Sequence, residues 1–258
     1  MAEVSPPSVM GFAEAARFGD WALKLPHRSD MDRVVWCTRG QGRALLDGER
    51  IGFGAQCAIY VPAGSLFCLD IGRNALGHIL ECDPTLLRFG DGPAIAGLAR
   101  SSNANEQMAL TQAFETIARE AAQKPPQWEE AMRLQARAVA LWLVRHEFDH
   151  GTDDAARRLV RRFVDQFPRS PAATFSVKEA AARLNVSVQH LTTVCSRQTG
   201  FSALQLLNAD LAHDVAVKLR KKQSSHSEIA QRAGFASASY FSRFVKKQCG
   251  ASPSAIQK

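Results

Sequence analysis

The order of apolar and polar positions divides the chain into two parts with different periods. Between Val34 and Glu81, short apolar runs alternate with turn signals, among them Asp47-Gly48 and the segment PAG at residues 62–64. Asp-Gly between two alternating runs is a strong signal for a β-hairpin, and many short strands at this spacing favour an antiparallel sandwich or barrel. We therefore predict a small β-barrel in the N-terminal part.

From about residue 105 the apolar positions recur every three or four residues, which predicts helices. The segments NEQMALTQAFETIAREAAQ and QWEEAMRLQARAVALWLVRHEF form two amphipathic helices separated by Pro125-Pro126. Their apolar faces carry, in the first helix, Leu110, Phe114 and Ile117, and in the second, Met132, Ala136, Ala140 and Leu143. This helical hairpin provides a dimerisation surface or covers the open end of the barrel, and the pattern does not distinguish the two.

The polar segment HGTDD at residues 150–154 is the best candidate for a linker. Beyond it the periodicity predicts only helices. We therefore expect an α+β chain of two domains, residues 1–150 with the barrel and the helical hairpin, and residues 151–258 with helices alone.

The helical part contains the same small unit twice. EAAARLNVSVQHLTTVCSRQTGFSA begins at Glu179, and EIAQRAGFASASYFSRFVKKQCGASP begins at Glu228. At an offset of 49, and of 50 after one extra residue in the turn, seven positions are identical. The matched residues of the first unit are Glu179, Ala181, Arg183, Ser187, Gln198, Gly200 and Ser202.

Each unit has the residues that a helix, a tight turn and a second helix require. The turn needs a residue that tolerates a left-handed backbone, the second helix needs a serine cap, and its end needs a glycine. The turn residue is Asn185 in the first unit and Gly234 in the second. The serine caps are Ser187 and Ser237, and the glycines at the helix ends are Gly200 and Gly250. This arrangement lets the second helix lie in the major groove of DNA.

The second helix of each unit has one apolar and one polar side. We expect the apolar side to be buried, with Leu191, Val194 and Cys195 in the first unit and Tyr240, Phe241, Phe244 and Val245 in the second. Small polar side chains and one arginine face outward as candidate base contacts, because Arg pairs with guanine and Gln with adenine. They are Gln189, Thr192, Thr193, Ser239, Ser242 and Arg243. The candidate phosphate contacts are Arg197, Lys246 and Lys247.

About the last 105 residues resemble the DNA-binding domain of the AraC/XylS family of bacterial transcription regulators. The motif GFASASYFSRFVKKQCGASP, with SEIAQRAGF at its start, carries this resemblance. The resemblance implies two helix-turn-helix units joined by a long helix. The first helix would span residues 153–167 and the connecting helix residues 204–222. It also implies an activator rather than a repressor, and a contact with RNA polymerase.

The segment RGQGRALLDGERIGFGAQCAIYVPAG, at residues 39–64, is similar to the cupin-like sensing domain of many family members. The resemblance implies that a small-molecule effector, a regulatory protein or homodimerisation controls the DNA-binding part. Four aromatic residues either line such a ligand pocket or fill the barrel core: Trp36, Phe53, Tyr60 and Phe67.

Charge separates the two parts in the same way as periodicity does. The chain has a net charge of +7, but residues 152–258 carry +10 and residues 1–151 carry −3. A basic half favours a polyanionic partner, with double-stranded DNA as the leading candidate. With 46% apolar and 22% charged residues, and no apolar run long enough to cross a bilayer, the sequence predicts a cytoplasmic protein that does not bind membranes.

Two alternatives remain beside a ligand-controlled regulator. A metal-dependent cupin enzyme would use closely spaced histidines and a carboxylate, whereas His27 and His78 near the barrel lack that spacing. We therefore expect no metal, no cofactor and no catalysis. A redox-responsive regulator would use exposed thiols of low pKa among the N-terminal cysteines, of which two could face each other across the sheet: Cys37, Cys57, Cys68 and Cys82.

Overall fold

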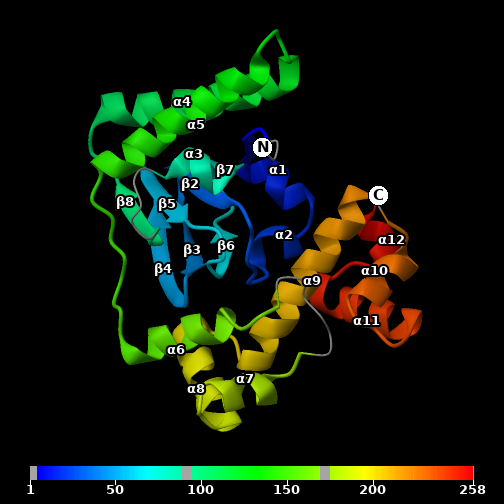
Figure 1. Cartoon of the computed structure of the whole chain (residues 1–258). Coiled ribbons are helices and arrows are strands. Elements are labelled where there is room, and N and C mark those ends of the chain that lie inside the picture. The colour runs from blue at the N-terminus through cyan, green and yellow to red at the C-terminus, as the bar shows by residue number, and fades with distance from the viewer. Residues whose placement is uncertain (1–4, 89–93, 169–174, 223, 258) are drawn as a thin grey trace.

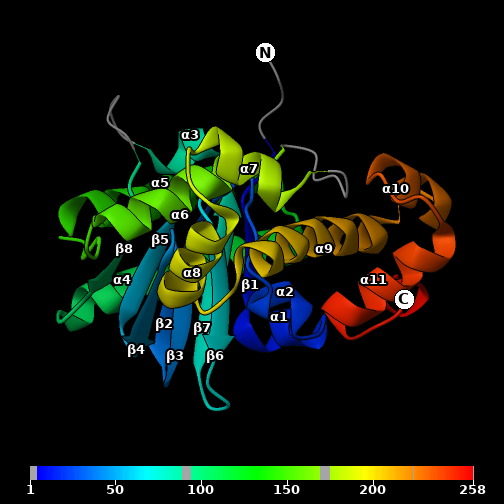
Figure 2. The same cartoon turned by 90° about the horizontal axis from the view of Figure 1, so that it is seen from below.

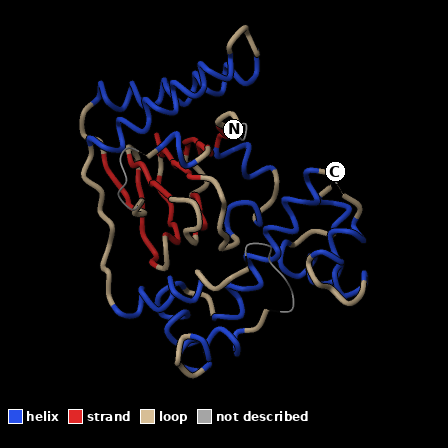
Figure 3. Tube along the Cα trace, in the orientation of Figure 1, coloured by secondary structure: helices blue, strands red, loops and turns tan. Residues whose placement is uncertain are grey.

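The computed structural model describes residues 5–88, 94–168, 175–222 and 224–257, and it shows two antiparallel sheets followed by a series of helices (Figure 1, Figure 3). The strands are β1 (Ser8–Gly11), β2 (Asp32–Arg39), β3 (Gln41–Leu46), β4 (Glu49–Gly54), β5 (Cys57–Val61), β6 (Phe67–Ile71), β7 (Leu76–Cys82) and β8 (Gly97–Arg100). The helices among and after them are α1 (Phe12–Arg17), α2 (Trp21–Lys24), α3 (Pro84–Leu87), α4 (Ala104–Gln123) and α5 (Trp128–Arg145).

The strands form two facing sheets with the orders β1-β7-β2-β5-β8 and β4-β3-β6. Apolar side chains between them, including Val35, Phe53, Ile59 and Leu69, form a buried core. Among the described strands, β1 and β8 are the edges of one sheet and β4 and β6 those of the other, so the predicted closed barrel is wrong. The alternation of apolar residues fixes which side chains face inward, but a sandwich and a barrel use the same alternation.

The predicted hairpin turn at Asp47-Gly48 is confirmed. Both residues have positive φ angles, 49° and 88°, as a type I′ turn requires. The turn joins β3 to β4, whose register pairs Leu46 with Glu49.

The helical hairpin of α4 and α5 packs against the outer face of the five-stranded sheet, on the side away from β3, β4 and β6 (Figure 1). Phe114 and Ile117 of α4 and Val139 of α5 are buried there with Trp36 of β2. The Trp36 indole N–H donates to Thr111 Oγ1 at 2.9 Å. The hairpin therefore covers a sheet face rather than the end of a barrel.

The remaining helices are α6 (Ala155–Val164), α7 (Val177–Arg183), α8 (Val188–Thr199), α9 (Ala203–Lys221), α10 (His226–Arg232), α11 (Ala238–Cys249) and α12 (Pro253–Ile256). The long helix α9 connects the pair α7 and α8 to the pair α10 and α11, as predicted for residues 204–222 (Figure 2). None of the helices in the described ranges is long and apolar enough to span a membrane.

Several buried contacts join the N-terminal part of the chain to the helices beyond the linker. Arg157 of α6 donates to the Asp47 carbonyl at 3.1 Å and to Glu49 Oε2 at 2.8 Å. On the other side, Trp21 of α2 is buried in the same apolar cluster as Val215 of α9 and Phe241 of α11. Figure 2 shows α1 and α2 lying beside α9. The segment that consists of α1, α2 and the loop up to β2 (residues 12–31), here called the N-terminal segment, thus covers the connecting helix.

Candidate nucleic-acid interface and adjoining cavity

The first helix-turn-helix unit consists of α7 and α8. Ser176 and Glu179 form a reciprocal capping box at the start of α7. Asn185, in the turn, has a left-handed φ of 55°, and Ser187 caps α8 by accepting from the His190 N–H. A left-handed Gly200 ends α8. The turn and cap residues predicted from the sequence therefore occupy the predicted positions.

The second unit, α10 and α11, repeats this local chemistry. Ser225 and Glu228 form the capping box, Gly234 in the turn has a φ of 76°, and Ser237 accepts from the backbone N–H of residue 240. Gly250 ends α11 in the left-handed conformation. Because both units satisfy their helix ends in the same way, the duplication in the sequence is a duplication of structure.

Most of the side chains predicted to contact DNA lie on the surface of α8 and α11. All the candidate base contacts are exposed except Thr192, which is half-buried, and the three candidate phosphate contacts are exposed. The opposite sides of the helices are buried, with Leu191 and Cys195 inside the first unit and Phe241 and Val245 inside the second. Each recognition helix therefore presents a small polar face to solvent.

Tyr240 does not lie in the buried seam that the sequence pattern predicts. Its side chain is 51% exposed, and its ring only borders that of Phe235, with 5.6 Å between the centroids. Phe235, from the turn, contacts Phe241 and Phe244 and fills the inner position instead. Tyr240 therefore joins the outer face of α11, next to Ser239.

All four aromatic residues that the sequence offers for either a ligand pocket or the core pack into cores, Tyr60 only partly buried. Trp36 packs under the helical hairpin, Phe53 lies between the two sheets, and the Tyr60 hydroxyl donates to Asp32 Oδ2 at 2.6 Å. None of these three lines the cavity described next, whereas Phe67 does. Inward strand positions are filled by core contacts, so aromatic character alone does not distinguish a pocket wall from a core.

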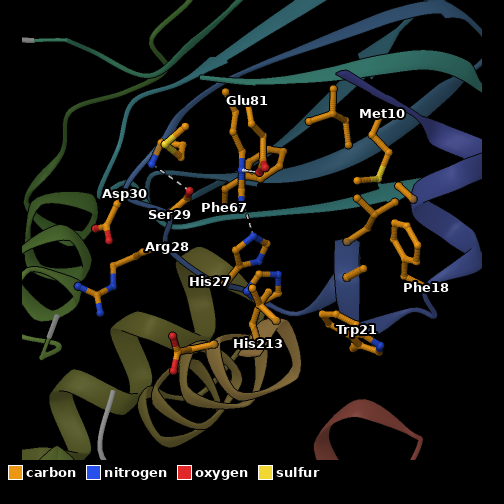
Figure 4. A pocket seen from close by; sticks show the side chains of 18 of the residues that line it. Met10, Phe18, Trp21, His27, Arg28, Ser29, Asp30, Phe67, Glu81 and His213 are labelled. Atoms are coloured by element: carbon orange, nitrogen blue, oxygen red, sulfur yellow. Dashed lines mark hydrogen bonds and ion pairs between the residues drawn. The ribbon is translucent and has the colours of Figure 1, made fainter. Parts of the chain in front are cut away.

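A cavity of about 470 Å³ lies between the N-terminal segment and α9 (Figure 4). Its apolar lining includes Met10, Phe18, Trp21, Phe67 and Val217. Its walls come from β1, α1, α2, the loop before β2, the strands β2, β6 and β7, and α9, so both parts of the chain line it. Sequence reasoning missed this cavity.

Arg28 and Asp210 form one polar wall of the cavity. The Arg28 Nη2 atom lies 2.9 Å from Asp210 Oδ2, and its backbone N–H donates to Asp210 Oδ1 at 2.9 Å. The guanidinium also donates to the carbonyls of Phe167 and Pro168 at 3.2 and 3.1 Å. The loop before β2 is therefore held to the middle of α9 and to the end of the segment after α6.

His27 and His213 lie next to each other in the lining of the cavity (Figure 4). Arg33 belongs to the same lining. The two histidine rings stack, with 3.4 Å between the centroids and 6° between the planes. Arg33 contacts His27 Nε2 at 2.6 Å and forms an ion pair with Glu81. Burial lowers the pKa of both histidines, that of His213 to about 3. The charge of His213 lowers the pKa of His27 further, and the charge of Arg33 lowers that of both rings.

Two cations of α9 line the other end of the cavity. The Arg220 guanidinium lies over the Phe18 ring, 3.2 Å from its centroid, and burial lowers the pKa of Arg220. Lys221 is exposed at the same end. Among the described residues neither cation forms an ion pair, but the charge of Glu14 acts on Arg220. Two cations against one carboxylate leave this end positively charged, which favours an anion.

All six cysteines are free and buried. Cys37 and Cys57 are opposite each other on β2 and β5, as the sequence allows for two of them. Burial raises the pKa of Cys37 and Cys82, and raises those of Cys68, Cys195 and Cys249 to about 12. Thiols of this kind are poor nucleophiles, which argues against the redox-responsive alternative. Within the described ranges, no three His, Cys, Asp or Glu side chains are grouped to hold a metal ion.

A family model of a helix-turn-helix domain matches residues 180–258. No curated protein matches the chain. Among solved structures, a substituted form of apo ToxT from Vibrio cholerae is 14% identical over 98% of this chain and 97% of that chain, with a TM-score of 0.52. ToxT from the same organism with a bound unsaturated fatty acid is 14% identical over 100% of this chain and 97% of that chain, with a TM-score of 0.51. At this identity the likeness shows a shared fold.

Proposed function

Because residues 180–258 form a helix-turn-helix domain of the AraC/XylS type, we propose that the chain is a sequence-specific transcription regulator that binds double-stranded promoter DNA. The duplicated unit carries this proposal. In each copy a capped second helix buries one side and exposes small polar or basic side chains on the other. Small outer side chains let a helix approach base edges closely in the major groove.

The length of α9 supports binding by both units at once. A helix of 19 residues is about 28 Å long, close to one turn of DNA at roughly 34 Å. The recognition helices α8 and α11 would therefore enter successive major grooves on one face of the duplex.

We assign direct base reading to the outer faces of these two helices, where all the residues are exposed except the half-buried Thr192. The residues are Gln189, Thr192 and Thr193 of α8, and Ser239, Ser242 and Arg243 of α11. Arg197, Lys246 and Lys247 supply phosphate contacts, which add affinity without sequence preference. Tyr240 is exposed beside this face and contributes a further contact to the sugar-phosphate backbone.

The cavity between the N-terminal segment and α9 is the proposed effector site. Phe18, Met10 and Val217 supply an apolar wall, and Arg220 and Lys221 supply unpaired positive charge at one end. This combination fits an apolar molecule with one anionic group, such as a fatty acid, and the ToxT structure with a bound unsaturated fatty acid has the same fold. An occupant would change the contact between the N-terminal segment and α9, and thereby the placement of both helix-turn-helix units.

The proposal includes activation of transcription through contact with RNA polymerase and assembly as a homodimer. The outer side of the helical hairpin supports the dimer. It exposes large apolar residues that no described element covers: Met108, Leu134, Leu141 and Val144. A second copy of the hairpin would bury them.

Mapping the genomic segments that the protein occupies tests the proposed function. The expected result is a limited set of promoter segments with a shared sequence, lost in cells that carry Arg243→Ala. Uniform occupancy without a shared sequence would remove the proposal. Calorimetry with a long-chain fatty acid tests the effector site separately, with Val217→Asp as the variant that should lose binding. Leu76→Asp, at an exposed position that does not line the cavity, is its surface control.

A further inference from the structure

The stacked pair of His27 and His213 joins the two parts of the chain in the lining of the cavity. His27 belongs to the loop between α2 and β2, and His213 lies in the middle of α9. Their side chains are almost fully buried, and Trp21 packs against His213 with 5.8 Å between the ring centroids. A stack this close requires that the two rings do not repel each other.

The hydrogen bonds of His27 fix its protonation state. Its Nδ1 lies 2.7 Å from the Leu25 carbonyl, which only accepts, so Nδ1 carries the proton. Its Nε2 lies 2.6 Å from a nitrogen of Arg33, which only donates, so Nε2 accepts. A second proton on Nε2 would face the Arg33 guanidinium. His27 is therefore neutral while this contact is closed.

The charged groups around the pair do not favour an added positive charge. Three of the four carboxylates at the cavity already have cationic partners, since Glu81 pairs with Arg33, Asp210 with Arg28 and Asp214 with Lys218. The fourth, Asp30, is exposed to solvent. The other groups facing the cavity are cations of α9, Arg220 and Lys221. Two imidazolium rings in the stack would therefore meet each other and Arg33.

We propose that protonation of His27 and His213 controls the contact between the loop of His27 and α9. The loop stays packed on α9 while both rings are neutral, and it separates from α9 when the rings take up protons. The inference deepens the proposed function, on which it rests, by making acidification a second input to the effector site. Opening the contact would free α9, and with it both helix-turn-helix units, from the N-terminal segment.

The direction of the effect follows from where the protons bind. Burial lowers the pKa of both rings in the closed contact, whereas a histidine in water titrates near pH 6.5. The open state therefore binds more protons, and the closed contact is at full strength above pH 6.5 and weakens below it. For two such groups the equilibrium shifts toward the open state by up to about 100-fold between pH 7.5 and 5.5.

Hydrogen–deuterium exchange of the full chain tests this inference without DNA. The readout is exchange in residues 25–34 and 208–218 at pH 7.5, 6.5 and 5.5, corrected for the intrinsic pH dependence of exchange. In the unsubstituted protein the corrected rate should rise by up to about 100-fold as the pH falls. The double variant His27→Phe with His213→Phe keeps two stacked rings that cannot take up protons, and its rate should stay constant.

Two further variants keep the test decisive. His213→Phe alone, which preserves the His27 hydrogen bonds, should show a rise of about 10-fold. His146→Phe, which changes a histidine stacked on Trp142 outside the cavity, should keep the full rise. A rate independent of pH in the unsubstituted protein, or an undiminished rise in the double variant, overturns the inference. Loss of sequence-specific DNA binding would instead overturn the proposed function, because the exchange readout does not depend on it.

Discussion

Arg28 and Asp210 lie 182 positions apart in the sequence and form an ion pair with 2.9 Å between Nη2 and Oδ2. The Asp210 side chain is 5% exposed and that of Arg28 is 17% exposed. The pair joins the loop before β2 to the middle of the helix that connects the two helix-turn-helix units. The ion pair therefore links the proposed effector site directly to the DNA-binding part.

Replacing Arg28 by alanine should lower the free energy of unfolding by about 3 kcal/mol, near the lower end for a broken buried ion pair. The cost arises because Asp210 stays buried without its counter-ion, although the backbone N–H of residue 28 still bonds it. Urea unfolding of the full chain measures this. Arg158→Ala breaks an exposed pair with Asp153 and should cost less than about 0.5 kcal/mol. Equal losses in the two variants would mean that the buried pair is no stronger than a surface contact.

Gly234→Ala should destabilise the second unit by about 1 to 2 kcal/mol, because its φ of 76° is unfavourable for a residue with a Cβ. Gly234→Asn should cost less, since Asn185 adopts the same conformation in the first unit. Thermal unfolding provides the comparison. Gly52→Ala is the matched control, because an added Cβ there meets no atom within 4 Å. If alanine and asparagine at position 234 behaved alike, the turn would not require the left-handed conformation.

Arg243→Ala should weaken binding to a specific site by about 1 to 3 kcal/mol and leave the salt dependence nearly unchanged, as expected for a base contact. Lys247→Ala should instead weaken binding to all sequences alike and reduce the salt slope by about one. Fluorescence anisotropy over a range of salt concentrations distinguishes the two patterns. A uniform loss for Arg243→Ala would reassign this side chain to a phosphate.

The thiols of the native protein should react very slowly with a disulfide reagent at pH 8. Burial raises the pKa of Cys68, Cys195 and Cys249 to about 12, so only about one thiol in ten thousand would be ionised at each position. The measurement is the absorbance of the released chromophore before and after denaturation. Fast reaction of a native thiol, together with altered DNA affinity after mild peroxide treatment, would restore the redox-responsive alternative.

Local chemistry made the helix-turn-helix units predictable from the sequence. Asn185 and Gly234 mark the turns, and Ser187 and Ser237 mark the caps, because each of these residues acts within four positions of its partner. Tyr240 was the exception. The periodic pattern predicts that its side chain is buried, but Phe235 from the turn occupies that place beside Phe241.

The cavity could not be predicted, because its residues come together only through the fold. His27 and His213 belong to different parts of the chain, and a single histidine in either segment carries no signal of its partner. Asp210 and His213 are three positions apart in a helix whose inner side is otherwise apolar, which is the one available hint that this side meets polar groups. The strand pattern predicts a barrel where the structure has two facing sheets, because alternation of apolar residues does not report whether sheet edges meet.

The ratio of affinities for a mapped genomic site and for an unrelated duplex of equal length tests the central claim most directly. A sequence-specific regulator that uses both units should bind its site at least about 10³-fold more tightly at physiological salt. Equal affinities for the two duplexes would contradict the account, since they would leave only the attraction of a basic surface for DNA.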